Sequence, residues 1–442
     1  MPLNNWAALQ DIESAYPDGL NFKPGTELHD KLVRLVNECA ERGFAANSTC
    51  VTEYEKIDKQ LDCFMSPDEL DRRRAGKDKR KPVNIVIPQQ VANLDIFKTG
   101  MSKAFFAGKY IHRYQGHGSP ERAAKAVIAN EVIALIAQWF GHRRSLDIQW
   151  SDAFSYGRGW LWGKWSKRMA PAYVTEQVDE MLAMTLQGMG GDYNPGDIVR
   201  YLSDEMTVEK EGTDWIPIDP YQVLYDPTVK PDRFQDSEFF GWAMRTDAQI
   251  LVGQEDDPEE NLFNCQGLPL IARGFGFSRF FRIDSEREQR LPEQSSQWKS
   301  SIHSTNVDIV YMMTRIVPRD WNLGESKKPQ LWFFAVAGDR LLIKAHQIKD
   351  RHGMYPVTLA APNARGHQVS PVSHLMITGG IATATDYLVK RRLDFLDTAH
   401  NGKFIIDPTK LEYQDFKNSD GGPTIVRMKK SAFGSEIGRA HV

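Results

Sequence analysis

Four carboxylates in the middle of the chain have the side-chain type and the spacing that could do chemistry. They are Asp219, Asp226, Asp232 and Asp236. Carboxylate oxygens are ligands for Mg²⁺, so this group could hold the metal ion of a nuclease. Two of the four directly precede a proline, and an Asp-Pro pair is typical of turn initiation. We therefore interpret the aspartates as turn residues between strands, which accounts for them without a metal ion.

Other catalytic and cofactor motifs are missing from the sequence. It has no P-loop, no Gly-x-Ser-x-Gly and no His-Glu-x-x-His, and its eleven histidines show no metal-ligand spacing. Gly157-Arg158-Gly159 could suggest a phosphate-cradling loop, but a dinucleotide-binding loop follows a strand and precedes a helix. These glycines end a predicted helix and precede a predicted strand, which fits a helix C-cap. The sequence favours a protein that is not an enzyme and has no cofactor or metal. A metal-dependent nucleic-acid-processing enzyme is the alternative.

Two basic runs could contact phosphate. The first contains Arg72-Arg73-Arg74 and Lys77 to Lys81, and the second is Lys390-Arg391-Arg392. Such a run is usually a solvated surface, and phosphate contact is the alternative. The whole chain has a formal charge of −3 and a pI of about 6.4. Because tight DNA binding usually needs a strongly basic face, this balance argues against it. It does not exclude a surface past which DNA slides.

The composition is that of a large globular chain. Its 442 residues are 41% hydrophobic, which predicts a sizeable core and roughly two to four domains. No run of about twenty apolar residues could span a bilayer, and the first residues do not form a secretory signal. We therefore expect a soluble chain that is not exported. The four cysteines have no Cys-x-x-Cys spacing, so we expect free thiols in a reducing compartment: Cys39, Cys50, Cys63 and Cys265.

The first half of the chain predicts helices that lead into strands. Apolar spacing predicts a helix over 26–42, and a short strand over 82–88 followed by a helix that reaches Phe105. Ser119-Pro120-Glu121 is typical of a helix start, and the apolar pattern from Ile128 to Phe154 predicts one long helix or two in tandem. A tryptophan-rich strand follows the glycines. Val223-Leu224-Tyr225, bounded by prolines, is a further strand.

The second half predicts strands and then a helix. Residues 284–305 are polar and indicate an exposed loop, after which strands are predicted at 307–311, 330–336 and 340–345 with a turn at Gly338-Asp339. Ser370-Pro371 indicates the start of a helix. A short strand, Phe404-Ile405-Ile406, comes afterwards. One face of the helix carries apolar residues: Ile377, Ile381, Ala384, Leu388 and Phe395.

The order of these elements resembles that of the portal proteins of tailed bacteriophages, most of all the podovirus type of head-to-tail connector. The resemblance covers about Pro82 to Val426 and rests on order rather than on one motif. It includes the Asp-Pro-x-x-Val-Leu-Tyr-Asp-Pro segment, the β-rich stretch after it and the proline-started helix that leads into Asn-Gly-Lys-Phe-Ile-Ile-Asp. The resemblance implies an α+β, portal-type fold with a mixed helical and β wing, long stem helices and a small β-rich clip insert. One departure is Thr378-Gly379-Gly380, where many relatives have a more polar helix.

Applied to this chain, the resemblance implies a wing at 1–281, a polar linker toward the stem at 282–305 and a clip at 306–366. A stem helix, a tunnel loop and the start of the crown side would follow at 367–435. The implied role is structural: a homo-oligomeric ring, a 12-mer in the family, at the capsid vertex through which viral DNA is packaged and ejected. The implied partners are the terminase large subunit, head-tail adaptor proteins, the major capsid protein or scaffold, and double-stranded DNA. No membrane is implied.

The same resemblance implies assembly in the host cytoplasm and a final location in the virion. It also identifies candidate channel residues: Lys390, Arg391, Arg392 and Lys403. Each of them could equally lie on a solvated helix face or in an ion pair between subunits. A virion structural protein without a channel is the second alternative to the portal interpretation.

The last residues carry a separate signal. Residues 436–442 resemble the translation of a common sequencing adapter up to its stop codon. We interpret them as a non-native tail, so that the chain would be a truncated gene product. A natural terminal tail is the alternative, since chain ends are often poorly ordered.

Overall fold

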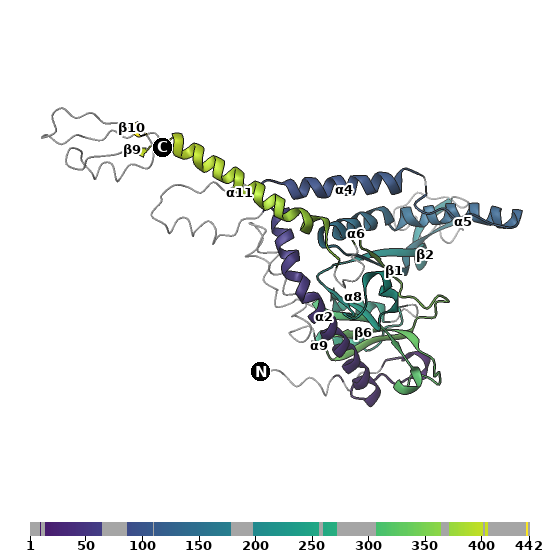
Figure 1. Cartoon of the computed structure of the whole chain (residues 1–442). Coiled ribbons are helices and arrows are strands. Elements are labelled where there is room, and N and C mark those ends of the chain that lie inside the picture. The colour runs from purple at the N-terminus through teal and green to yellow at the C-terminus, as the bar shows by residue number, and fades with distance from the viewer. Residues whose placement is uncertain are drawn as a thin grey trace, which may run out of the picture.

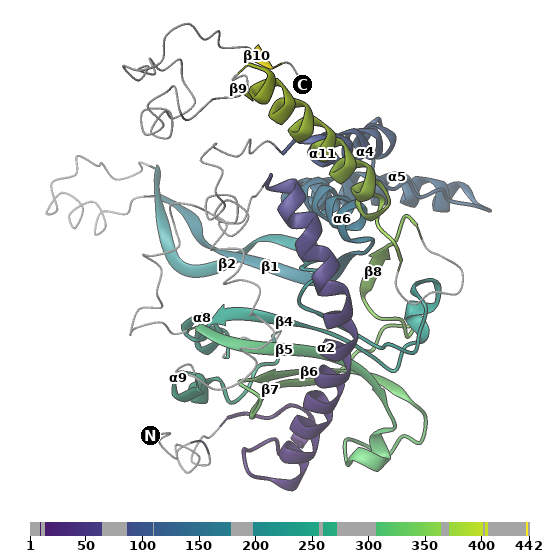
Figure 2. The same cartoon turned by 60° about the vertical axis from the view of Figure 1, so that its left-hand side comes forward.

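The structure is a computed structural model of the whole chain, and it has the predicted α+β composition. It describes residues 9, 14–63, 86–108, 110–177, 198–255, 260–271, 306–363, 371–400, 403–404 and 439–440. The basic run at 72–81, the linker at 282–305, and residues 364–370 and 405–438 lie outside the described residues. Two β-sheets form the body, a long helix crosses them, and a layer of helices lies at one end (Figures 1 and 2).

The described α-helices are α2 (Glu27–Leu61), α4 (Gln89–Phe106), α5 (Pro120–Trp139), α6 (His142–Tyr156), α8 (Ala248–Gln254), α9 (Leu268–Ile271) and α11 (His374–His400). Short 3-10 helices are η1 (Pro17–Gly19), η2 (Pro231–Asp236), η3 (Cys265–Gly267) and η5 (Pro318–Trp321). The strands are β1 (Gly159–Gln177), β2 (Ile198–Ile218), β3 (Val223–Tyr225), β4 (Phe239–Asp247), β5 (Asn306–Ile316), β6 (Gln330–Ala337), β7 (Leu341–Gln347), β8 (Val357–Ala360), β9 (Lys403–Phe404) and β10 (Arg439–Ala440).

The larger sheet is antiparallel and has five strands in the order β3-β4-β5-β6-β7. Its strands are nearly continuous runs of buried side chains, because α2 covers one face, and aromatic residues together with α8 and α9 cover the other. Phe334 and Val336 of β6 pack with Leu32 and Val36 of α2 in one core cluster. The helix that the sequence predicted over 26–42 therefore continues to Leu61, with Thr26 as its N-cap.

The strands at 306–366 do not form a separate β module. β4 pairs with β5 along its whole length, with Phe240 opposite Met313, and β8 joins the other sheet. The physical reason is that β4 would otherwise present an unpaired edge to solvent, which β5 covers. The β-rich stretch predicted as an insert is therefore continuous with strands on the N-terminal side of residue 281.

The smaller sheet has three strands in the order β2-β1-β8. β1 and β2 form a long antiparallel ribbon, and β8 pairs only with the start of β1, where Trp160 lies opposite Leu359. The Trp160 ring packs against Phe234 and Phe240 at 5.1 and 4.8 Å between ring centroids. This aromatic contact joins the two sheets into one core.

The sequence predicted one long helix or two helices in tandem, and the structure has two. α5 and α6 are separate helices bent by 70° at Gly141, which has a left-handed backbone with φ of 66°. Gly157 is also left-handed at φ of 82° and ends α6, as the C-cap interpretation of the two glycines predicted. The strand predicted over 82–88 falls mostly outside the described residues, and 86–88 are not in a strand.

Among the described helices, none alone is long and apolar enough to cross a membrane. The bent pair α5 and α6 reaches that length and composition only when both helices are taken together.

Two of the four central aspartates hold turns. Asp219 Oδ1 accepts a hydrogen bond from Tyr221 N at 3.0 Å. The buried Asp226 carboxylate accepts three, from Thr228 N and Oγ1 at 3.0 and 2.7 Å and from Glu238 N at 3.1 Å. Burial alone would raise the pKa of Asp226, but these hydrogen bonds outweigh burial and lower it. Within the described residues, no group of acids, histidines and cysteines could hold a metal ion.

Replacing Asp226 by Ala should lower the free energy of unfolding by about 2 kcal/mol at neutral pH, because two backbone donors lose a charged acceptor. The folded-state pKa is depressed, so this stability is present above the unfolded pKa of about 3.9 and is lost as the pH falls through the folded value. Urea unfolding at several pH values measures it. The exposed Asp236, replaced by Ala, is the control and should change stability by less than about 0.5 kcal/mol. A gap between Asp226→Ala and the parent that stays constant down to the acid limit would contradict this assignment.

Candidate functional site

The helix α11 carries three of the four candidate channel residues (Figure 1). Among the described residues, its N-terminal half contacts the body as far as Asp386, whose Oδ1 accepts a hydrogen bond from Ile87 N at 3.0 Å. It begins at His374, not at Ser370-Pro371 as the sequence predicted. Ser373 Oγ accepts a hydrogen bond from Met376 N at 2.9 Å and so takes the capping role. The correction has a steric reason: the backbone at Pro371 lies against Gly157, where a Cβ atom would come within 2.9 Å of the Pro371 carbonyl oxygen.

A buried amide anchors this helix to α4. Gln90 is 2% exposed, its Nε2 donates to the Leu375 carbonyl at 3.4 Å, and its Oε1 accepts from Thr378 Oγ1 at 2.9 Å. The His374 ring packs against the rings of Phe97 and Phe154, and burial lowers its pKa. These contacts fix the direction in which α11 leaves the body.

The candidate channel residues do not converge on one point. Lys390 is half-buried, while Arg391 and Arg392 are exposed. Consecutive helical residues are about 100° apart around the axis, so the three cations are spread over more than half of the circumference. Arg391 Nε donates to the Tyr387 hydroxyl at 3.0 Å, one turn earlier on the same helix. Lys403 begins the short strand β9, whose backbone pairs with β10, so that Lys403 lies opposite Ala440.

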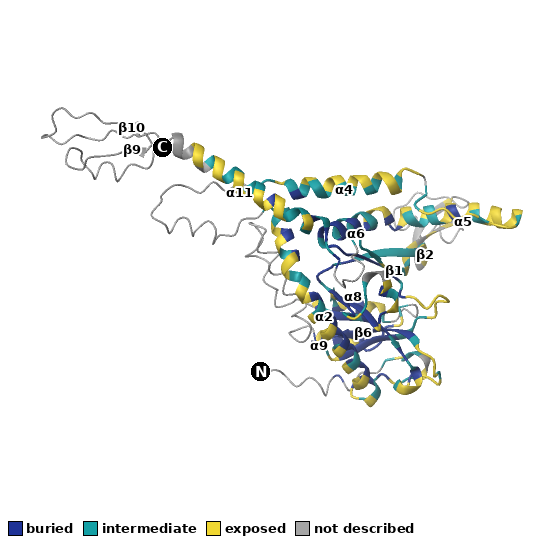
Figure 3. Ribbon diagram, viewed as in Figure 1, coloured by how far each residue is buried: buried dark blue, intermediate teal, exposed yellow. Residues whose placement is uncertain are grey.

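The apolar stripe of α11 faces solvent. Ile377, Ile381, Leu388 and Phe395 are 57 to 68% exposed. Leu375 and Ala382, which lie off the stripe, are the buried residues of the helix that the structure describes. The body therefore leaves the predicted apolar stripe uncovered, and Figure 3 shows in yellow how much of α11 is exposed.

A second apolar helix is also uncovered. From 126 to 139, Glu131 is the only charged residue of α5, yet Ile128, Val132, Leu135 and Trp139 are 37 to 65% exposed. Asn130 is the one residue of α5 in the buried class, and its side chain exchanges hydrogen bonds with the backbone of Tyr114. The C-terminal end of α5 contacts β2 and α6. The sequence analysis interpreted this apolar pattern only as helix periodicity. The presence of a single charged residue over 126–139 was the sequence signal that this helix packs against another surface.

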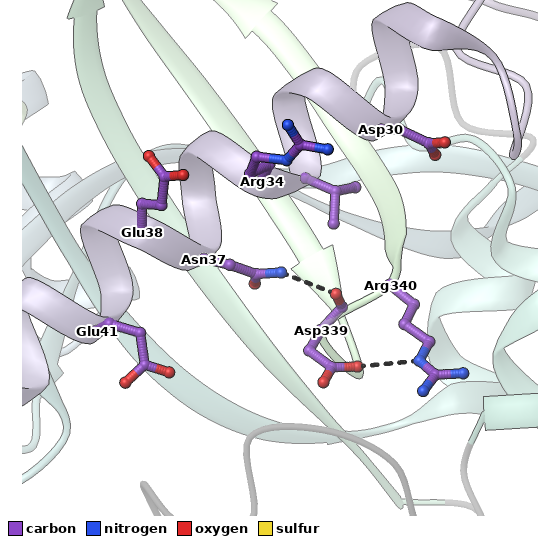
Figure 4. A pocket seen from close by; sticks show the side chains of 8 residues that line it. Asp30, Arg34, Asn37, Glu38, Glu41, Asp339 and Arg340 are labelled. Atoms are coloured by element: carbon purple, nitrogen blue, oxygen red, sulfur yellow. Dashed lines mark hydrogen bonds and ion pairs between the residues drawn. The ribbon is translucent and has the colours of Figure 1, made fainter.

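A surface hollow of about 540 Å³ lies elsewhere, between α2 and the turn joining β6 to β7 (Figure 4). Asn37 Nδ2 donates to the Asp339 carbonyl at 2.9 Å, and Arg340 Nε lies 3.5 Å from Asp339 Oδ1. The hollow mixes acids and arginines, and none of the residues predicted as channel residues lines it. Its lining is Asp30, Val33, Arg34, Asn37, Glu38, Glu41, Asp339 and Arg340.

The described part of the chain therefore exposes apolar side chains on two helices, α5 and α11. A basic helical turn, residues 390–392, lies on α11. Comparison with models of known protein families gives no match for this chain, and a search of curated protein sequences gives none either.

Proposed function

We propose that this chain is a subunit of a portal-type ring at a capsid vertex, through which double-stranded viral DNA is packaged and ejected. In this proposal the chain has a structural role without catalysis or a cofactor. The packaging motor, with the terminase large subunit, and the head-tail adaptor proteins dock on the assembled ring, and the major capsid protein or scaffold surrounds it. The ring is assembled in the host cytoplasm and ends in the virion.

The observation that carries the proposal is the exposed stripe of α11. A helix of 27 residues is about 40 Å long, and much of this one stands clear of the body while exposing large apolar side chains. Monomeric soluble proteins rarely expose a continuous apolar surface of this kind, so it is typical of a contact surface between chains. The single chain is therefore an incomplete unit, as a ring subunit must be.

The basic helical turn at 390–392 supports the proposal that DNA passes through the ring. A conduit must attract DNA weakly enough for the duplex to move, and a few cations on a near-neutral chain meet this requirement better than a strongly basic groove. Lys390 lies about 200° around α11 from Leu388 and can face DNA while the apolar stripe faces a neighbouring chain. Arg391 and Arg392 lie about 60° and 40° from Leu388, so they flank the stripe.

Negative-stain electron microscopy of the purified full chain tests the proposal. Rings with a central opening of duplex width are expected, together with an oligomer by light scattering. Compact monomers that cleave DNA when Mg²⁺ is added would overturn the proposal in favour of a nucleic-acid-processing enzyme. Oligomers without an opening would instead indicate a virion structural protein without a channel.

A further inference from the structure

The two uncovered helices leave the body in opposite directions. In both views α11 extends from one end of the helical layer and α5 from the other (Figures 1 and 2). A contact between two different surfaces of the same chain is heterologous, and repeating it generates a ring or a filament. We propose that the apolar stripe of α11 in one copy packs against α5 of the next copy. This inference rests on the proposed function for the closure of the ring, and it names the two surfaces that meet.

The spacing of the two stripes matches. On α11 the positions 377, 381, 384 and 388 follow each other at intervals of four, three and four residues, and on α5 the positions 128, 132, 135 and 139 do the same. This alternation keeps a seam on one side of each helix and is the pattern of knobs-into-holes packing. Two seams with the same period can stay in contact over several turns.

The exposed apolar surface is large enough for a stable contact. A fully covered aromatic side chain buries about 150–250 Å². Half-exposed side chains of this kind on both helices together offer on the order of 1,000 Å², which is about the lower bound for a specific protein interface. The apolar residues that contribute are Ile377, Ile381, Tyr387, Leu388, Phe395 and Leu396 of α11, and Val127, Ile128, Val132, Leu135 and Trp139 of α5.

Crosslinking between single cysteines tests the contact. Ile128→Cys and Leu388→Cys are made in a chain whose half-buried Cys50 and Cys63 are replaced by Ser, and a short bismaleimide joins cysteines that lie close together. A mixture of the two single variants should give a crosslinked dimer, whereas neither variant alone should. The chain with both cysteines should give a ladder of oligomers.

The matched control uses Ala123→Cys with Thr383→Cys. Both positions are exposed, and each lies about 140° around its helix from the corresponding test position. The chain with both control cysteines should not give the ladder of crosslinked oligomers. A dimer of Leu388→Cys alone would mean that two α11 helices pair with each other, and would overturn the proposal. A shift in the fluorescence of a dye on Ile128→Cys upon addition of phosphatidylcholine vesicles, without crosslinking to position 388, would also overturn it in favour of a lipid surface.

The outcomes separate this inference from the proposed function. Rings in electron micrographs without a crosslink between positions 128 and 388 would overturn the α5–α11 contact and leave the ring in place. A chain that stays monomeric at all concentrations would overturn both.

Discussion

Replacing Leu388 by Glu should break the assembly into monomers that remain folded. Leu388 is 66% exposed in the single chain, so the substitution should change the free energy of unfolding by no more than about 0.5 kcal/mol. In a covered seam, by contrast, the change removes about 1.5–3 kcal/mol of apolar burial. It also places a carboxylate in an apolar contact, which adds a desolvation cost.

The sum of these two effects is about 4 kcal/mol per contact, which is a weakening of roughly 1,000-fold in Kd. Sedimentation velocity over a range of protein concentrations measures it, and circular dichroism shows whether the monomer is intact. Thr383→Glu is the control, because this exposed residue lies on the same helix but away from the stripe. Equal effects of the two substitutions would argue against the stripe as the contact surface.

Two helix starts and one turn were predictable because their signals are local, whereas the start predicted at Ser370-Pro371 was wrong. Ser119 and Thr26 accept hydrogen bonds from backbone N–H groups of the first turn, and such caps depend on only three or four residues. The turn predicted at Gly338-Asp339 is present, and both residues have positive φ. Each of these features is specified within one turn of the chain and needs no knowledge of distant contacts.

The pairing of strands was not predictable in this way. β4 and β5 are adjacent in the sheet but separated by more than fifty residues of sequence, and alternation of side chains does not say which strand lies next to which. The stretch at 306–366 therefore read as a module of its own, whereas it completes a sheet that begins at Val223. Likewise, periodicity identified the apolar faces of α5 and α11 but could not say whether the same chain covers them.

Polar as well as apolar contacts join the helices to the sheets of the body, and one such polar contact is made by Asp58. This carboxylate is 6% exposed near the end of α2. It accepts hydrogen bonds from the hydroxyl of Tyr156 in α6 at 2.5 Å and from the hydroxyl of Tyr221 before β3 at 2.6 Å. Asp58 therefore ties the helix that crosses the sheets to the helical layer.

Asp58→Ala should lower the free energy of unfolding by about 4 kcal/mol. Hydrogen bonds to a charged acceptor contribute about 1.5–3 kcal/mol each, and both phenols would be left without this acceptor in a packed site beside Tyr54. Denaturant unfolding measures the loss. Glu53→Ala on the same helix is the control, because it removes only a surface ion pair with Lys56 and should cost less than about 1 kcal/mol.

Because Asp58 lies near the end of α2 that contacts α11, Asp58→Ala should also change how firmly α11 is held. Gln60, two residues after Asp58 on α2, lies against Gly379 of α11, where a Cβ atom would be 3.5 Å from Gln60 Oε1. If Asp58 positions the end of α2, Asp58→Ala should speed hydrogen exchange in the first turns of α11 and weaken association, although the apolar stripe is unchanged. Tyr221→Phe, which removes one hydroxyl and keeps the ring, should show a smaller effect of the same sign. A loss of stability with no change in exchange at 374–382 would mean that α4 and α6 hold α11 without a contribution from α2.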